Sequence, residues 1–157
     1  MQTFLPYPDF ARSAAVLDRA RLGKQRVEAL QVLRGLTVPG YGWRNHPAVR
    51  MWTGYEEALV RYGLDVCAEW VAQGRPDTCA ATMITDFGGH RPGAAVRDQE
   101  QLAEAGELPP WLGDHAFHHS HQSALVRKAP EIYAERFPGV PGDLPYVWPA
   151  SDRDPAA

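Results

Sequence analysis

The apolar positions of this chain recur at three- and four-residue steps, which is the spacing of one face of a helix. A first run spans residues 12–36 and is stopped by the Pro/Gly segment VPGYG at 38–42. Its apolar members are Val16, Leu17, Ala20, Ala29, Leu30, Leu33 and Leu36. The pattern predicts one helix over residues 12–36.

A second run follows the segment Asn45-His46-Pro47. Either of the first two residues is suited to cap a helix, and Pro47 is suited to its first turn. The run ends at Gly74, and its apolar members are Trp52, Tyr55, Leu59, Tyr62, Val66 and Trp70. A stripe of this length predicts packing into a core rather than a cofactor site.

The rest of the chain predicts one more substantial helix and several short ones. Residues 114–128 have a thinner apolar face, residues 94–105 and 130–137 form shorter polar patterns, and 77–87 is ambiguous. FGGHRPG (87–93) and LPPWLGD (108–114) indicate loops, and 138–157 an irregular, aromatic tail. No segment alternates as a strand does. We therefore expect an all-α, compact single domain over 1–149 with three main helices, and a disordered tail over 150–157.

Composition narrows the class of protein. Apolar residues make up 45% of the 157 residues, enough for a real core. No apolar run is long enough to cross a membrane, and the start MQTFLPYPDF does not resemble a secretion signal. We expect a cytoplasmic protein in which Cys67 and Cys79 are buried thiols.

The net charge of -3 hides a basic first third. The segment LDRARLGKQRVEALQ (17–31) places a single acid, Glu28, among several bases, which are Arg19, Arg21, Lys24 and Arg26, with Arg12 just upstream. Arg12, Arg19 and Arg26 recur every seven residues, and such a row can follow a phosphate backbone. The alternative is an ordinary solvated face with a weak Lys24–Glu28 ion pair.

The segment HAFHHSHQS contains His115, His118, His119 and His121. Imidazoles bind zinc, yet no carboxylate or cysteine completes a metal-binding pattern. We rank a polar cleft lining first, ordinary surface second and a metal site third. Neighbouring residues suited to phosphate or base contacts are Ser120, Gln122, Ser123, Arg127 and Lys128. The rings of Tyr146 and Trp148 can pack as a structural clasp or stack on bases.

The order of these segments resembles the pyrimidine-dimer DNA glycosylase family, whose best-known member is the phage endonuclease V. The resemblance is more specific to a bacterial branch with the pattern MQTFLPYPDF…LDRARLGKQRVEAL…GWRNHPAVRMWTGYEEAL…SHQSALVRK…PYVWP, and it spans residues 1 to about 149. Members of the family are all-helical, in agreement with the pattern above.

The resemblance implies a DNA-repair enzyme that cuts the glycosidic bond at a damaged or modified pyrimidine and then nicks the strand as a β-lyase. In the family, the amine at the start of the chain forms an imine with the sugar, and no cofactor or metal is needed. Met1 matches that position, and the bulky Gln2 favours retention of Met1. The matching acid is Glu28, which would stabilise positive charge on the sugar and shuttle protons. Arg21 stands where the family has a histidine.

The expected partner is double-stranded DNA with a lesion, bound by a cytoplasmic, nucleoid-associated monomer with no membrane contact. The expected DNA-binding residues are Arg19, Lys24, Arg26, His118, His121, Gln122, Arg127, Lys128 and Trp148. Val27 and Gln31 replace two phosphate-binding arginines of the family. Two alternatives stay open: a non-enzymatic nucleic-acid-binding protein on the same scaffold, and a metal-dependent hydrolase built on the histidine cluster.

Overall fold

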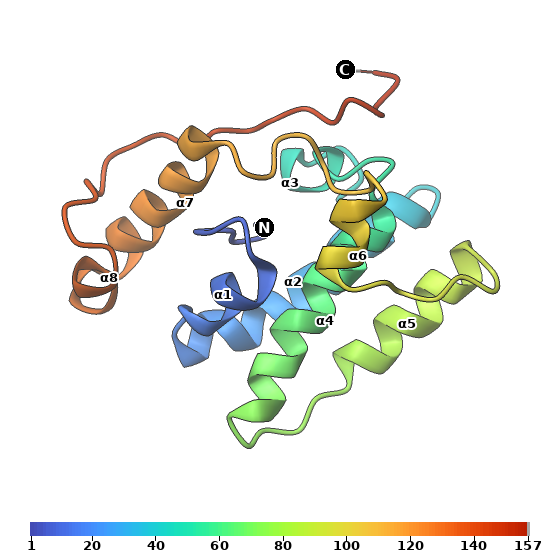
Figure 1. Ribbon diagram of the computed structural model, residues 1–157, viewed down its shortest axis with the longest axis horizontal. Helices are drawn as coiled ribbons and strands as arrows, with labels where there is room; N and C mark the ends of the chain where they lie inside the picture. The colour runs from blue at the N-terminus through green and yellow to red at the C-terminus, as the bar shows by residue number, and fades with distance from the viewer. Residues whose placement is uncertain (157) are drawn as a thin grey trace.

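The computed structural model describes residues 1–156, and within that range the chain forms eight helices and no strand (Figure 1). The all-α prediction is confirmed. The helices are α1 (Phe10–Ala15), α2 (Arg19–Thr37), α3 (Pro47–Arg50), α4 (Glu56–Ala72), α5 (Cys79–His90), α6 (Gln99–Glu104), α7 (His115–Lys128) and α8 (Pro130–Arg136). None of the helices in the described range is long and apolar enough to cross a membrane.

Helices α2 and α4 pack along each other, and α5 contacts both of them. The closest approach is at Gly63 of α4, where an added Cβ would lie 2.5 Å from the Met83 sulfur and 3.1 Å from the Ala29 Cβ. An added Cβ at position 63 would therefore force the Met83 side chain to move and would press against Ala29. This three-helix unit is the rigid support on which the N-terminal segment lies.

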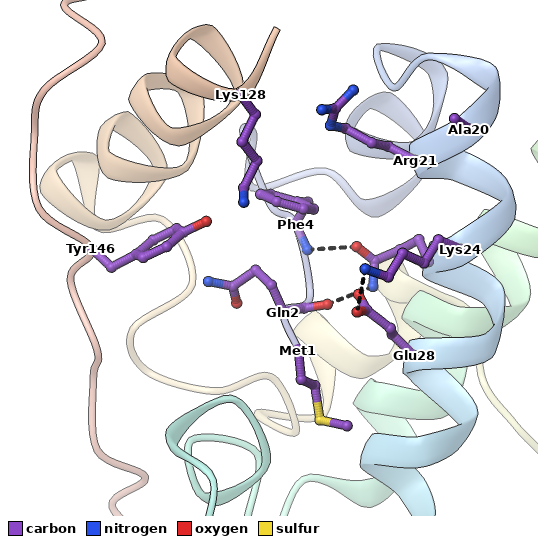
Figure 2. A pocket seen from close by; sticks show the side chains of 10 residues that line it. Met1, Gln2, Phe4, Ala20, Arg21, Lys24, Glu28, Lys128 and Tyr146 are labelled. Carbon is purple, nitrogen blue, oxygen red and sulfur yellow. Dashed lines mark hydrogen bonds and ion pairs between the residues drawn. The ribbon is translucent and has the colours of Figure 1, made fainter.

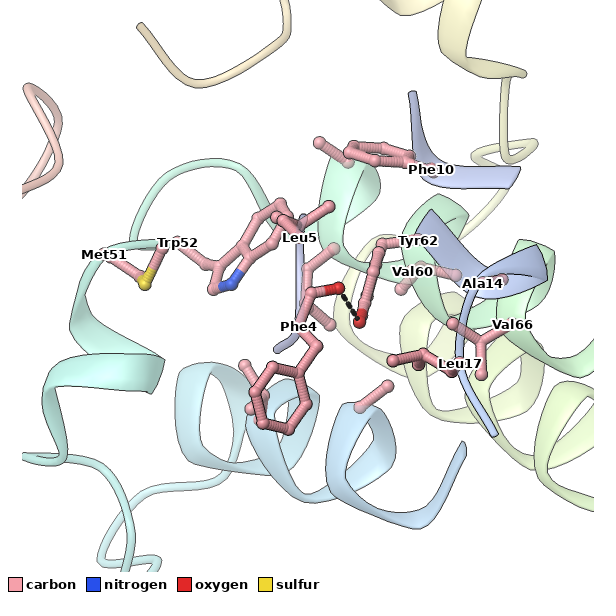
Figure 3. Packing of buried hydrophobic residues seen from close by; sticks show 14 of the residues in the cluster. Phe4, Leu5, Phe10, Ala14, Leu17, Met51, Trp52, Val60, Tyr62 and Val66 are labelled. Carbon is pink, nitrogen blue, oxygen red and sulfur yellow. Dashed lines mark hydrogen bonds between the residues drawn. The ribbon is translucent and has the colours of Figure 1, made fainter. Parts of the chain in front are cut away.

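The N-terminal segment, residues 2–5, is extended and buried, although no β-strand pairs with it. Side chains from the helices satisfy its backbone instead. Tyr62 of α4 donates to the Phe4 carbonyl at 2.7 Å, a contact that Figure 3 shows within the core. The Trp52 indole donates to Thr3 Oγ1, and the Leu5 amide donates to Nδ1 of His121 on α7. These contacts fix the first residues of the chain inside the molecule.

The single helix predicted over residues 12–36 is wrong, because the chain breaks into α1 and α2 between residues 16 and 18. Asp9 caps α1 through the Arg12 amide. Leu17 turns into the core, and Asp18 begins α2 with its amide bonded to the Tyr133 hydroxyl. Two caps and one buried leucine thus override the helical periodicity. The seven-residue row of arginines is therefore not carried by one helix.

Other helix boundaries differ from the predicted ones. His46 caps α3 as predicted, but α3 ends at Arg50 and a turn separates it from α4. FGGHRPG is not entirely a loop, because α5 continues to His90. The polar helix over 94–105 shortens to α6, where Asp98 forms a capping box with Gln101. Helices α7 and α8 match their predictions closely.

The tail after α8 has no helix as far as residue 156, in agreement with the predicted irregular segment. Residues 150–156, for which the sequence predicts disorder, instead make a set of contacts. Ser151 is buried and donates to the Thr53 carbonyl, and Asp154 binds Arg50 at 3.0 Å. Residue 157 lies outside the described residues. The tail therefore runs back from α8 across α7 to the α3 region (Figure 1).

Candidate active site

A pocket of about 390 Å³ opens between α2, the N-terminal segment, the end of α7 and the tail (Figure 2). It is lined by Met1, Gln2, Phe4, Ala20, Arg21, Lys24, Gln25, Glu28, Lys128 and Tyr146. Five predicted site residues meet here from both ends of the sequence, and these are Met1, Arg21, Lys24, Glu28 and Lys128. Three of them are cations and one is an acid.

Gln25 of α2 holds the N-terminal segment at the pocket. Its Nε2 donates to the Gln2 carbonyl at 2.7 Å, and its Oε1 accepts from the Phe4 amide at 3.0 Å. Residues three and four apart share one face of a helix, so Arg21, Gln25 and Glu28 project together. The amide that fixes the first residues of the chain is therefore on the same helical face as the acid.

Glu28 is only 12% exposed, and its carboxylate lies 3.7 Å from Lys24 Nζ. His46 lies within Coulombic range of both the Met1 amino group and Glu28. Burial and the Met1 charge lower the pKa of His46, and Glu28 acts in the opposite direction. Met1 and Glu28 themselves line the same pocket.

The cations of the pocket differ in how freely they can move. The Lys24 side chain is 75% exposed and can reach outward, whereas Arg21 is held by Asp18, whose Oδ1 lies 3.1 Å from Arg21 Nη1. Lys128 and Tyr146 form the opposite wall (Figure 2). The cations therefore surround the entrance of the pocket, and Glu28 lies deeper inside it. A positively charged entrance attracts a polyanion.

Two bases predicted to bind DNA do not line this pocket. Arg26 forms an ion pair with Asp77 at 2.5 Å and lies over the Trp70 ring, 4.4 Å from its centroid. These contacts hold Arg26 against α4 and the start of α5. Arg19 is exposed at the first residue of α2, outside the pocket lining.

His118 and His121 are buried on α7 and face the N-terminal segment rather than solvent. The Gly113 amide donates to Nε2 of His118, so the proton of that ring lies on Nδ1 and is donated to the Leu5 carbonyl at 2.7 Å. Burial lowers the pKa of both residues, that of His121 to about 3. Gln122 donates to the Pro6 carbonyl. These three predicted DNA contacts therefore position the N-terminal segment from the opposite side to Gln25.

The four histidines of α7 do not converge. His118 and His121 face Leu5, whereas His115 and His119 stack on each other with ring centroids 5.2 Å apart. Within residues 1–156, no three His, Cys, Asp or Glu side chains are grouped as metal ligands would be. This geometry gives the histidine-based hydrolase no support.

Arg127 and Trp148 lie beside the pocket. Arg127 donates to the carbonyls of Gly142 and Leu144 and so fastens the tail to α7. Trp148 is 40% exposed and packs edge-on against His46, at the rim of a shallower pocket of about 220 Å³. Trp148 also packs against Tyr146, with ring centroids 5.3 Å apart.

Five pocket residues lie outside the predicted site residues, and these are Gln2, Phe4, Ala20, Gln25 and Tyr146. Gln25 could have been found, because it lies between Arg21 and Glu28 at helical spacing. Tyr146 was expected to pack as a clasp or to stack on bases, but its meeting with Gln2 has no local signal, because it depends on how the two ends of the chain pack.

A helical domain whose pocket combines an amino terminus, one buried carboxylate and a positively charged entrance has the groups needed by an enzyme that acts on DNA. A model of the pyrimidine dimer DNA glycosylase family matches residues 1–83, more than half of the chain. The chain belongs to this family of DNA-repair enzymes, and its substrate is DNA. No curated protein and no solved structure matches it. The matched segment includes Met1, Arg21, Lys24 and Glu28, while Lys128 and Tyr146 lie beyond it.

Proposed function

We propose that this protein excises a damaged pyrimidine from double-stranded DNA through the amine of Met1 and then nicks the strand at the same sugar. The observation that carries the proposal is the pocket that Met1 and Glu28 line together. The amino group of Met1 and the carboxylate also act on one imidazole, that of His46. A nucleophile and a proton-handling acid in one pocket are what imine chemistry requires.

The first step forms one bond and breaks another. The lone pair of the neutral Met1 amine forms a bond to C1′ of the sugar, and the C1′–N1 bond breaks with its electron pair leaving on the base. The amine loses a proton and the base gains one.

The second step uses the imine. The C1′–nitrogen double bond forms as the C1′–O4′ bond breaks, and O4′ takes up a proton as the sugar ring opens. A proton then leaves C2′, and the C3′–O bond breaks with the phosphate as leaving group. Water finally hydrolyses the imine and frees the Met1 amine. Glu28 stabilises the positive charge on the sugar and accepts and returns the protons. Because Glu28 is mostly buried, its charge acts more strongly than it would in water.

The cations bind the strand. Lys24 and Lys128 approach from α2 and α7 on opposite sides of the pocket, and Arg21 lies on the α2 side (Figure 2). Such contacts release counterions and make binding salt-dependent. The damaged base must leave the stack for C1′ to reach Met1, and this costs a few kcal/mol, less at a lesion.

Reductive trapping tests the proposal. The protein is incubated with borohydride and a duplex containing one cyclobutane pyrimidine dimer, and in parallel with a duplex containing one abasic site. We expect a covalent protein–DNA adduct with both duplexes and none with the undamaged duplex. An unblocked Met1 that yields no adduct on either damaged duplex would overturn the proposal and favour a non-enzymatic DNA-binding protein.

A further inference from the structure

The residue after the candidate nucleophile has an unused hydrogen-bond donor. The Gln2 side chain lines the pocket, the residue is only 5% exposed, and its Nε2 has no hydrogen-bond partner among the described residues. A buried donor without a partner costs about 1–3 kcal/mol, so its retention calls for an explanation.

The orientation of this amide is fixed by its neighbour. Gln2 Oε1 accepts from the Thr3 amide at 3.0 Å. Turning the amide over would place its NH₂ group against the Thr3 N–H, so that two donors would face each other. The nitrogen must therefore point away from the backbone, and Figure 2 shows it directed across the pocket towards the Tyr146 hydroxyl.

Tyr146 covers the amide but does not satisfy it. The two groups make no hydrogen bond of ordinary geometry. Burial raises the pKa of Tyr146, and the Gln2 amide, which is near enough to act as a weak donor to the hydroxyl, lowers it. Tyr146 belongs to the tail, which α7 holds on either side of it through hydrogen bonds from the Leu144 and Val147 amides to Ser123 and Ser120. Rotation of the tyrosine ring, rather than release of the tail, would open the amide to a ligand oxygen.

The position of the donor limits which oxygen it can serve. Gln2 follows Met1 in the chain and lines the same pocket, so its amide faces the space in which a nucleotide held at Met1 would lie. On a pyrimidine nucleotide, the O2 carbonyl is attached to the carbon next to N1, on the same side as the breaking bond. As the C1′–N1 bond breaks, the electron pair spreads over N1 and O2, and a preorganised N–H donor stabilises charge that develops there.

We infer that Gln2 is a catalytic residue for base excision, whose amide N–H binds O2 of the departing pyrimidine and stabilises the negative charge on the leaving group. This inference rests on the proposed function. It assigns Gln2 to the first step alone, because an abasic sugar carries no O2 to bind.

The test compares both steps in one variant. Gln2→Met removes the donor, keeps the length of the side chain, and leaves a bulky second residue that favours retention of Met1. Single-turnover rates are measured on a duplex with one cyclobutane thymine dimer and on the same duplex with one abasic site. We expect base excision to fall about a hundredfold while cleavage at the abasic site changes less than about threefold. The same substitution at the exposed Gln73 is the control and should change neither rate.

Each outcome decides between the inference and its alternatives. Equal loss on both duplexes would assign Gln2 to holding Met1, and unchanged rates on both would leave the amide without a role; either result overturns the inference. Should Gln2→Met fail to fold, Gln2→Glu keeps the acceptor for Thr3 and must show the same selective loss of base excision. Wild-type protein inactive on both duplexes would instead refute the proposed function itself.

Discussion

Gln25 donates a hydrogen bond to the carbonyl of Gln2 at 2.7 Å, from a helical position one turn before Glu28. The same side chain accepts from the Phe4 amide. One amide therefore sets where the chain begins relative to where its acid lies. Without these hydrogen bonds, nothing on α2 would hold the extended N-terminal segment in place. The position of Met1 relative to Glu28 therefore depends on Gln25.

Replacing Gln25 by Leu should destabilise the fold and lower activity further than stability alone explains. The change leaves two buried backbone groups unsatisfied, each costing about 1–3 kcal/mol. Urea unfolding measures the free energy of unfolding, and trapping at conditions where the variant is folded measures the positioning of Met1. The exposed Gln73→Leu is the control. A folded Gln25→Leu protein with wild-type trapping rates would mean that the contact does not position the amine.

Glu28→Gln should abolish turnover while DNA binding is retained. The amide keeps the shape of the side chain but can neither carry the negative charge nor accept a proton from the sugar. We expect single-turnover cleavage to fall by at least about a hundredfold. Equilibrium binding to the dimer-containing duplex should be as tight as wild type or tighter. Glu104→Gln on the exposed face of α6 is the matched control, and full activity in Glu28→Gln would remove the acid from the mechanism.

Lys24→Met and Arg26→Met should separate DNA binding from stability. Lys24 is mostly exposed, so its loss should change the free energy of unfolding by less than about 0.5 kcal/mol and reduce the salt dependence of binding by about one phosphate contact. Arg26 neutralises the buried Asp77, so its loss should cost about 3 kcal/mol or more. Salt titrations and urea unfolding of both variants check the pair. The reverse pattern would place Arg26 on the DNA.

Stability should fall as the pH drops from 7 to 5, because His118 and His121 are buried as neutral rings. Burial lowers their pKa values in the folded protein, that of His121 to about 3. The unfolded chain therefore takes up protons first, below its ordinary histidine pKa of about 6.5. The folded state loses up to about 1.4 kcal/mol per pH unit for each ring until its own pKa is reached.

His121→Asn tests this origin of the pH dependence. The Asn oxygen can accept from the Leu5 amide as Nδ1 does, without a titrating group. Urea unfolding at pH 7 and pH 5 should show a smaller loss of stability in the variant than in the wild type. An unchanged difference between the two pH values would exclude His121 as a source of it.

The sequence predicted the helices where periodicity and caps agree. The cap at Asp114 gave α7 nearly at its observed bounds, and the stripe from Trp52 to Trp70 predicted the body and the end of α4 but not the turn that separates it from α3. It failed at the α1–α2 break, because Leu17 has the helical spacing of its neighbours and turns away only to fill the core. That choice depends on contacts with residues far along the chain, such as Tyr133.

The same division applies to the candidate site: residues related by local spacing were predicted, and those placed by long-range packing were not. Arg21, Lys24 and Glu28 share a helix face that spacing alone reveals, and all three line the pocket. His118, His121 and Gln122 have the chemistry of DNA contacts, yet they are used to bind the backbone of residues 5 and 6. In the sequence, a polar helix residue that contacts DNA cannot be told from one that binds the protein's own backbone. Only the path of the N-terminal segment, which the sequence does not encode locally, distinguishes them.

The amine that forms the imine is the central claim, and locating the trapped adduct tests it most directly. After borohydride reduction on the dimer-containing duplex, nuclease and trypsin digestion leave a nucleotide remnant on one peptide. Mass spectrometry should find it on the α-amine of Met1, in the peptide that ends at Arg12. A remnant on Lys24 or Lys128, or an unmodified Met1 peptide beside an active protein, would contradict the account.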